Sequence, residues 1–266
     1  MMKRDAAANP DLIDRALDAC SAWNALGGEV RDVDGARFVR NQLFTDVPGT
    51  NRVSHINAAS PDEIARLHTL VQREFGNVTP AFEVDHRTPP PFEARLVVDG
   101  YQAHESLVML LEGELRGTTP SCDVRPILDA DDWRAWEVLS AECNLGYPVR
   151  SGTPAGLAEA AVLSASRRAK CPPLRYYAAY VDGAPAGLFS SWEGVSGIGI
   201  VENLSVREEM RGRGIATALV HACVAAARAS RAGPVALTCN PLDWPKAWYA
   251  RLGFRAVAMQ RAYTAE

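Results

Sequence analysis

The sequence predicts a mixed α/β (α+β) fold arranged in two successive halves. Three observations lead to this prediction. Segments with strand and helix patterns alternate along the 266 residues. A stretch rich in Gly, Thr, Pro and Ser interrupts the pattern at 113–123. A short helical motif that ends in Gly and an aromatic residue occurs once on each side of that break, at 92–101 and 248–254. We infer a diverged internal repeat.

The N-terminal half opens with a helical pattern at 10–22. Two short strands are expected at 29–33 and 36–40, and a third at 51–57. Ser60 and Glu63 then have the spacing of a capping box, which predicts the start of a helix that runs to about residue 75. A strand at 80–85, a short helix at 91–98 and a strand at 105–111 complete this half.

The C-terminal half repeats this order. A strand at 123–128 precedes a helix from 131 to about 143, for which Asp129 or Asp131 is the expected N-cap. Asp182 and Gly183 predict a hairpin turn between strands 174–182 and 185–192. Next come a strand at 197–206, a helix from 215 that ends near 232–234, a strand at 235–239, a helix at 245–252 and a strand at 254–260.

Composition and charge exclude several classes of protein. The chain is 47% hydrophobic and 23% charged, which is typical of a globular domain and argues against disorder. Lys and Arg number 28 against 32 Asp and Glu, which gives a net charge of −4 and disfavours a nucleic-acid partner. No apolar run approaches the roughly 18 residues that cross a bilayer, so we expect no membrane partner.

The six cysteines and five histidines are too scattered for the usual metal-site spacings, so we expect no metal. The N-terminus has no apolar stretch after its basic residues, which argues against secretion. Scattered cysteines without a signal peptide fit reduced thiols, and hence a cytoplasmic location.

The clearest chemical signal lies between the strand at 197–206 and the helix that follows. Two glycines there allow the backbone to approach a ligand closely, and the first turn of the helix offers amide donors and a positive dipole end. These features predict a pyrophosphate site, with Arg211 and Arg213 as charge partners. The segment that forms it consists of Arg211, Gly212, Arg213, Gly214, Ile215, Ala216 and Thr217.

Two common nucleotide loops do not fit this segment. It lacks the Gly-Lys-Ser/Thr of a Walker loop, and Thr217 stands where a dinucleotide fingerprint requires glycine. The segment instead resembles the pyrophosphate loop of the GNAT superfamily of CoA-dependent N-acyltransferases, Gln/Arg-x-x-Gly-x-Gly/Ala, matched by Arg211, Gly214 and Ala216. The flanking stretches 202–206 and 248–254 also resemble family motifs, in the family's order.

This resemblance implies two tandem GNAT-like domains, each a mixed, mostly antiparallel sheet flanked by helices. Residues 1–116 would form a degenerate repeat without CoA, because no glycine cradle or arginine precedes its helix at 61. Residues 123–266 would form the catalytic domain. In the family, the pantetheine arm of acetyl-CoA pairs with the backbone of the fourth strand, which corresponds here to Leu204, Ser205 and Val206.

The resemblance also suggests two proton carriers. Strict alternation places Glu202 on one face with Ile198, Ile200, Leu204 and Val206, where apolar surroundings would raise its pKa and suit it to be the general base. The alternative is that a bulge turns Glu202 outward, or that it anchors a loop. Tyr249 resembles the family's general acid, which protonates the departing thiolate; its alternative role is packing.

The expected function is transfer of an acetyl group from acetyl-CoA to a primary amine of a small molecule by direct attack. A protein N-terminus or lysine is the alternative acceptor, and a non-catalytic acyl-CoA sensor is the alternative from another class. The N-terminal half would cover the catalytic half, shape the acceptor pocket, or do both. A homodimer is compatible with the sequence. The residues considered for a substrate groove are Trp23, Arg37, Arg40, Asn51 and Arg52.

Overall fold

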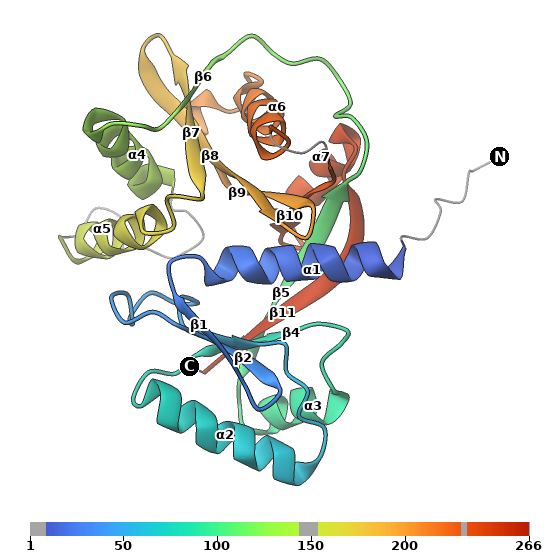
Figure 1. Cartoon of the computed structure of the whole chain (residues 1–266). Coiled ribbons are helices and arrows are strands. Elements are labelled where there is room, and N and C mark those ends of the chain that lie inside the picture. The colour runs from blue at the N-terminus through green and yellow to red at the C-terminus, as the bar shows by residue number, and fades with distance from the viewer. Residues whose placement is uncertain (1–8, 144–153, 230–232, 266) are drawn as a thin grey trace.

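The computed structural model describes residues 9–143, 154–229 and 233–265 (Figure 1). The first half begins with helix α1 (Pro10–Ala25). Pro10 occupies its first position, and the side chain of Asn9 caps it by accepting the backbone N–H of Asp11. The remaining elements of this half are strands β1 (Glu29–Val33), β2 (Ala36–Arg40) and β3 (Arg52–Ser54), helix α2 (Pro61–Phe75), β4 (Ala81–Val84), α3 (Pro90–Val98) and β5 (Gln102–Leu111).

The second half starts with β6 (Asp123–Pro126), α4 (Ala130–Cys143) and α5 (Pro154–Arg168). There follow β7 (Arg175–Val181), β8 (Ala184–Val195), β9 (Ile198–Val206), a short 3-10 turn (Glu208–Met210), α6 (Ile215–Ala227), β10 (Val235–Cys239), α7 (Pro245–Leu252) and β11 (Arg255–Thr264).

Most predicted elements are confirmed, and the local signals that predicted them are present. Asp182 and Gly183 both have positive φ, as a tight hairpin turn requires. Asp129 accepts hydrogen bonds from the backbone N–H groups of Asp131 and Asp132 at 2.9 Å and so starts α4. The prediction missed α5 altogether, and it placed the end of α6 too late, because that helix ends at Ala227 and not near 232–234.

The described strands form one sheet in the order β1-β2-β3-β4-β11-β5-β10-β9-β8-β7-β6. Only β3 with β4 and β9 with β10 run parallel, so the sheet is mixed and mostly antiparallel, as predicted. The two parallel pairs hold equivalent places in the two halves, and α2 connects one pair as α6 connects the other. This correspondence agrees with the internal repeat.

The two halves exchange their last strands. β5, from the first half, lies between β11 and β10, and β11, from the second half, lies between β5 and β4. Each half therefore completes the sheet of the other. Figure 1 shows the red β11 running from the upper half into the lower one.

Helix α1 also crosses between the halves. It lies across the middle of the molecule (Figure 1) and contacts β5, β8, β9, β10 and β11. Its buried residues Leu17 and Cys20 pack in one core with Ile198, Ile200 and Trp136 of the second half. The opposite face of the same strands packs against α6 and α7. A third core lies in the first half beneath α2 and α3. The C-terminal end of α1 thus reaches the boundary between the halves.

Among the described residues, no helix is both long enough and apolar enough to cross a membrane.

Candidate active site

Strands β9 and β10 separate soon after they meet. Their recorded pairs are Gly199 with Val235 and Ile200 with Ala236. Beyond Ile200, β9 contains a bulge, since its pairing with β8 passes from Glu202–Ser190 to Ser205–Leu188. Asn203 lies in this bulge with φ +65°. The hydroxyl of Tyr176 donates to the side-chain oxygen of Asn203 at 3.1 Å, which fixes the bulge from the core.

Glu202 fills the gap where the two strands part. Its Oε1 accepts hydrogen bonds from the backbone N–H of Thr238 on β10 at 2.5 Å and from the Thr238 hydroxyl at 2.7 Å. A side chain thus replaces the ladder bond that β9 no longer makes. Burial raises the pKa of Glu202 to about 7, although the Thr238 hydrogen bonds favour the charged form. A carboxyl group with this pKa gains and loses protons near neutral pH.

The bulge corrects one prediction. Strict alternation would place Glu202, Leu204 and Val206 on the face occupied by Ile198 and Ile200, but this is wrong for two of them. Ile198 and Ile200 pack on the α1 side of the sheet, whereas Leu204 and Val206 pack on the α6 side. One extra residue in the strand reverses the orientation of every side chain after it. Glu202 precedes the bulge and stays on the α1 side, where it lines a pocket with Ile200.

The loop that follows β9 exposes a series of amide groups. Gly212 and Gly214 have φ of +77° and +80°, values that favour glycine. Gly214 is the N-cap of α6 and offers no side-chain cap to the first turn. Within the described part of the chain, no hydrogen bond is made by the N–H groups of Gly212, Arg213, Gly214, Ile215, Ala216 and Thr217. Arg211 and Arg213 are exposed beside them. Free donors, a helix N-terminus and two cations suit a diphosphate.

The segment between β5 and β6 lies over this loop. A Cβ on Gly214 would come within 3.0 Å of the Pro120 ring. Thr119 hydrogen bonds to Nδ1 of His221 on α6 at 3.0 Å. In Figure 1 the green segment arches over α6 on its way from β5 to β6. One wall beside the loop therefore comes from the connection between the halves.

Tyr249 lies on α7 and is 6% exposed. Its ring contacts Trp248 and Phe254, with centroid distances of 4.8 and 5.7 Å. Burial, and after it the negative charge of Glu202, raises the pKa of Tyr249. The phenol therefore keeps its proton at neutral pH, as a proton donor must.

A family comparison agrees with this geometry. Residues 172–256 match the model of the acetyltransferase (GNAT) domain family. This region is a GNAT acetyltransferase domain. It spans the parting strands, the loop before α6, and α7 with Tyr249. No curated protein matches the sequence significantly.

Solved structures show the same fold over most of the chain. A GCN5-related N-acetyltransferase from Kribbella flavida has a TM-score of 0.68 and 14% identity, over 95% of this chain and 94% of its own. A functionally unknown conserved protein from Staphylococcus epidermidis has a TM-score of 0.67 and 12% identity, over 89% and 93%. A tandem GNAT protein from the clavulanic acid biosynthesis pathway has a TM-score of 0.56 and 18% identity, over 87% and 78%.

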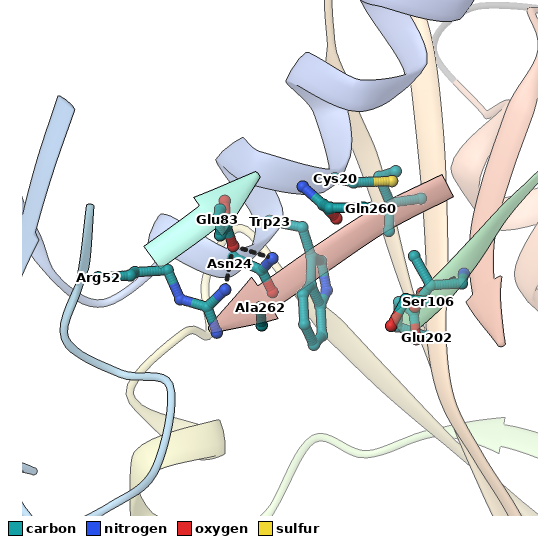
Figure 2. A pocket seen from close by; sticks show the side chains of 11 residues that line it. Cys20, Trp23, Asn24, Arg52, Glu83, Ser106, Glu202, Gln260 and Ala262 are labelled. Atoms are coloured by element: carbon teal, nitrogen blue, oxygen red, sulfur yellow. Dashed lines mark hydrogen bonds and ion pairs between the residues drawn. The ribbon is translucent and has the colours of Figure 1, made fainter. Parts of the chain in front are cut away.

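Glu202 of the GNAT domain faces a pocket that both halves build (Figure 2). Its volume is about 150 Å³. Of the five residues considered for a substrate groove, Trp23 and Arg52 line it. The other three lie elsewhere: Arg37 pairs with Asp32, Arg40 is exposed, and the buried Asn51 accepts the backbone N–H of Asn41.

The sequence did not single out several residues of this pocket, notably Asn24, Glu83, Ser106, Thr238 and Gln260. Glu83 alone gave a signal, as a charged residue inside the apolar strand at 80–85. The others come from strands and helices far apart in sequence. The exchange of β5 and β11 and the position of α1 bring them to one pocket. Within residues 9–143, 154–229 and 233–265, no group of His, Cys, Asp and Glu side chains could hold a metal ion.

The equivalent helix start in the first half differs in chemistry from that of the GNAT domain. Ser60 accepts the N–H of Glu63 at 3.3 Å, and the Glu63 carboxylate accepts the N–H groups of Ser60 and Ala59 at 2.8 and 3.0 Å. These hydrogen bonds lower the pKa of Glu63, so the carboxylate is ionised at neutral pH. The amides at the start of α2 are therefore occupied by a negative charge that belongs to the chain itself.

Proposed function

We propose that this protein is an acetyl-CoA-dependent N-acetyltransferase that acetylates a primary amine of a small molecule. The observation that carries the proposal is the placement of Glu202. It lies where β9 and β10 part, on the wall of a pocket, and the loop with unpaired amides follows directly after β9.

The residues present suit coenzyme A as the acyl donor. The N–H groups of residues 212–217 and the cations Arg211 and Arg213 would hold its diphosphate. The backbone of Leu204, Ser205 and Val206, at the parted end of β9, would pair with its pantetheine arm. The donor supplies an activated thioester, so no nucleophilic side chain is needed.

Two side chains of the chain would move the protons. An ammonium acceptor loses a proton to Glu202, and the neutral amine nitrogen attacks the thioester carbonyl carbon. A C–N bond forms and the C–S bond breaks. Tyr249 donates its proton to the departing sulfur, and the nitrogen of the new amide loses its second proton to water. Glu202 then releases the first proton to solvent, and solvent reprotonates Tyr249. Glu202 suits the first role because its pKa of about 7 leaves a large share ionised at neutral pH.

The first half would act as a degenerate repeat in this reaction. We propose that residues 1–116 and 123–266 form the two domains, and that these domains exchange β5 and β11. The carboxylate of Glu63 at the start of α2 would repel a diphosphate. The first domain would therefore bind no CoA, and it would serve the reaction through Trp23, Asn24, Arg52 and Glu83 in the pocket.

A thiol-release assay with acetyl-CoA and a library of acceptors tests the proposal. We expect turnover with small primary amines, because the pocket beside Glu202 has a volume of only about 150 Å³. Turnover with peptides alone would instead indicate a protein acetyltransferase. CoA binding without turnover on any acceptor would indicate a sensor. We further propose a cytoplasmic location, which the six free cysteine thiols support.

A further inference from the structure

The pocket beside Glu202 has two polar ends. In Figure 2, Glu202 and Ser106 lie at one end, and Arg52, Asn24 and Glu83 at the other. Thr238 belongs to the first end because it hydrogen bonds to Glu202. Figure 2 shows the ring of Trp23 between Arg52 on one side and Glu202 on the other. The end with Glu202 belongs to the proposed proton transfer. The end with Arg52 takes no part in that chemistry, so its composition bears on which acceptor fits.

The contacts of Glu83 show that this carboxylate binds the guanidinium of Arg52. Its Oε1 accepts from Nη1 of Arg52 and from Nδ2 of Asn24, and its Oε2 accepts from the Ser21 hydroxyl at 3.0 Å. Glu83 is only 4% exposed. Three donors and deep burial leave it little capacity for a ligand, so we infer that it holds the guanidinium in place.

Arg52 keeps donors free for a ligand. Its Nε donates to the carbonyl oxygen of Gly49 at 2.5 Å and its Nη1 donates to Glu83. Within the described residues, no protein group accepts a hydrogen bond from Nη2, which carries two N–H donors. Two hydrogen bonds thus fix the guanidinium through Nε and Nη1, and Nη2 is the donor that remains for a ligand in the pocket.

Trp23 adds a second free donor between the two ends. Its indole Nε1 is buried, and no hydrogen-bond partner for it exists in the described part of the chain. The amine of Lys170 lies 4.0 Å from the ring centroid and donates to the Trp23 carbonyl oxygen at 3.2 Å, so the ring is held. A buried polar group without a partner is costly, and a ligand oxygen would satisfy it once the ring turns Nε1 toward the pocket, since Nε1 is now out of contact with solvent.

We propose that the acceptor is a compact primary amine that carries a carboxylate or carbonyl oxygen, and that Arg52 selects it by hydrogen bonding to that oxygen. The inference rests on the proposed function, because it assigns the amine to the end with Glu202. The volume of about 150 Å³ limits the acceptor to a few heavy atoms beyond its amine, since an apolar cavity of that size holds benzene. The oxygen would lie toward Arg52 and Trp23.

Acceptors matched in length test this proposal at saturating acetyl-CoA. The set is 4-aminobutyrate, its amide and butylamine, with glycine and β-alanine as shorter acids. We expect kcat/KM to be at least tenfold higher for the acids or the amide than for butylamine. A preference for the acid over the amide would assign the oxygen to a carboxylate, and equal rates would assign it to a carbonyl.

Variants separate selection from folding. Arg52→Gln should raise KM for the oxygen-bearing acceptors at least tenfold, and it should change KM for butylamine far less. It also leaves Glu83 buried without its cation, so the double variant R52Q/E83Q, which removes both charges, should give the same loss of preference. Trp23→Phe replaces the indole by a smaller aromatic ring without an N–H group, and it should raise KM for the same acceptors. Arg40→Gln, an exposed arginine on β2, is the control and should change nothing.

Two results would overturn the inference while leaving the proposed function intact. One is a wild-type enzyme that acetylates butylamine as well as the acids and the amide. The other is a folded R52Q/E83Q variant that retains the wild-type preference. If the wild-type protein binds acetyl-CoA but acetylates no small amine, the proposed function itself fails, and the inference with it.

Discussion

Burial and hydrogen bonding act in opposite directions on the carboxyl group of Glu202. Removal from water favours the neutral acid, whereas the hydrogen bonds from Thr238 favour the carboxylate. The balance puts the pKa near 7, between that of an ordinary carboxyl group and that of an alkylamine. At this value the side chain can accept a proton at neutral pH and still return it to water.

Glu202→Gln should change the pH dependence of the reaction. In the wild type, kcat/KM should rise as pH increases toward about 7, because the base must be ionised. The variant should lack this rise and lose about a hundredfold between pH 7 and the pKa of the amine. Above the amine pKa the two enzymes should converge, because the acceptor is then already neutral. An unchanged pH–rate profile would contradict the assignment, and Glu137→Gln, at an exposed position of α4, is the control.

Tyr249→Phe separates acid catalysis from packing. Phe preserves the ring contacts with Trp248 and Phe254 and removes only the proton donor. We expect turnover to fall at least tenfold while the Kd for acetyl-CoA, measured by calorimetry, stays the same. Full turnover in the variant would assign Tyr249 to packing.

At the scale of elements, the β9 bulge sets the orientation of side chains, and the loop before α6 presents backbone amides. The bulge ends the regular pairing after Glu202 and turns Leu204 and Val206 toward the opposite face of the sheet. The loop then presents its free amides at the start of α6. Its geometry depends on Gly214, which combines a positive φ with a close approach to Pro120.

Gly214→Ala should weaken acetyl-CoA binding about tenfold or more. A Cβ there meets the Pro120 ring at 3.0 Å and strains a backbone with φ +80°, so the loop must shift. Gly183→Ala is the matched control: its φ is +79° and no heavy atom lies within 4 Å of its Cβ position. Both variants should lose stability in chemical denaturation because of the positive φ, and Gly214→Ala should lose more because of the contact with Pro120. Equal Kd values for acetyl-CoA in the two variants would show that the loop before α6 does not bind it.

At the scale of the whole molecule, the exchange of β5 and β11 joins the two halves into one sheet. Helix α1 adds a shared core with residues of the second half. The pocket depends on this arrangement, because Trp23 and Asn24 come from the end of α1, Gln260 from β11 and Ser106 from β5. The site therefore belongs to the assembled chain and to neither half alone.

Cleavage between the halves tests this interdependence. A protease site inserted at Gly117, which has open space around it, should be cut in the folded protein. The two fragments should stay associated in gel filtration and separate only in denaturant, because each contributes a strand to the interior of the other's sheet. Fragments that separate without denaturant would contradict the exchange.

The stoichiometry of acetyl-CoA reports on the difference between the two helix starts. We expect one acetyl-CoA per chain in calorimetry, because Glu63 occupies the amides at α2 and the amides at α6 are free. Binding of two equivalents would show that the first half also holds CoA.

The sequence by itself determined most of the elements (α5 is the exception), the mixed sheet and the GNAT motifs around residues 202–217 and 248–254. Those features follow from local sequence patterns, namely apolar residues that recur with a period of two or of 3.6, a capping box and a Gly-containing turn. Only the tertiary structure decided the exchange of β5 and β11, the reversal of Leu204 and Val206 at the bulge, and the meeting of Arg52, Trp23 and Glu202 in one pocket. Strand partners and pocket walls depend on contacts between residues far apart in the chain, which no local period encodes.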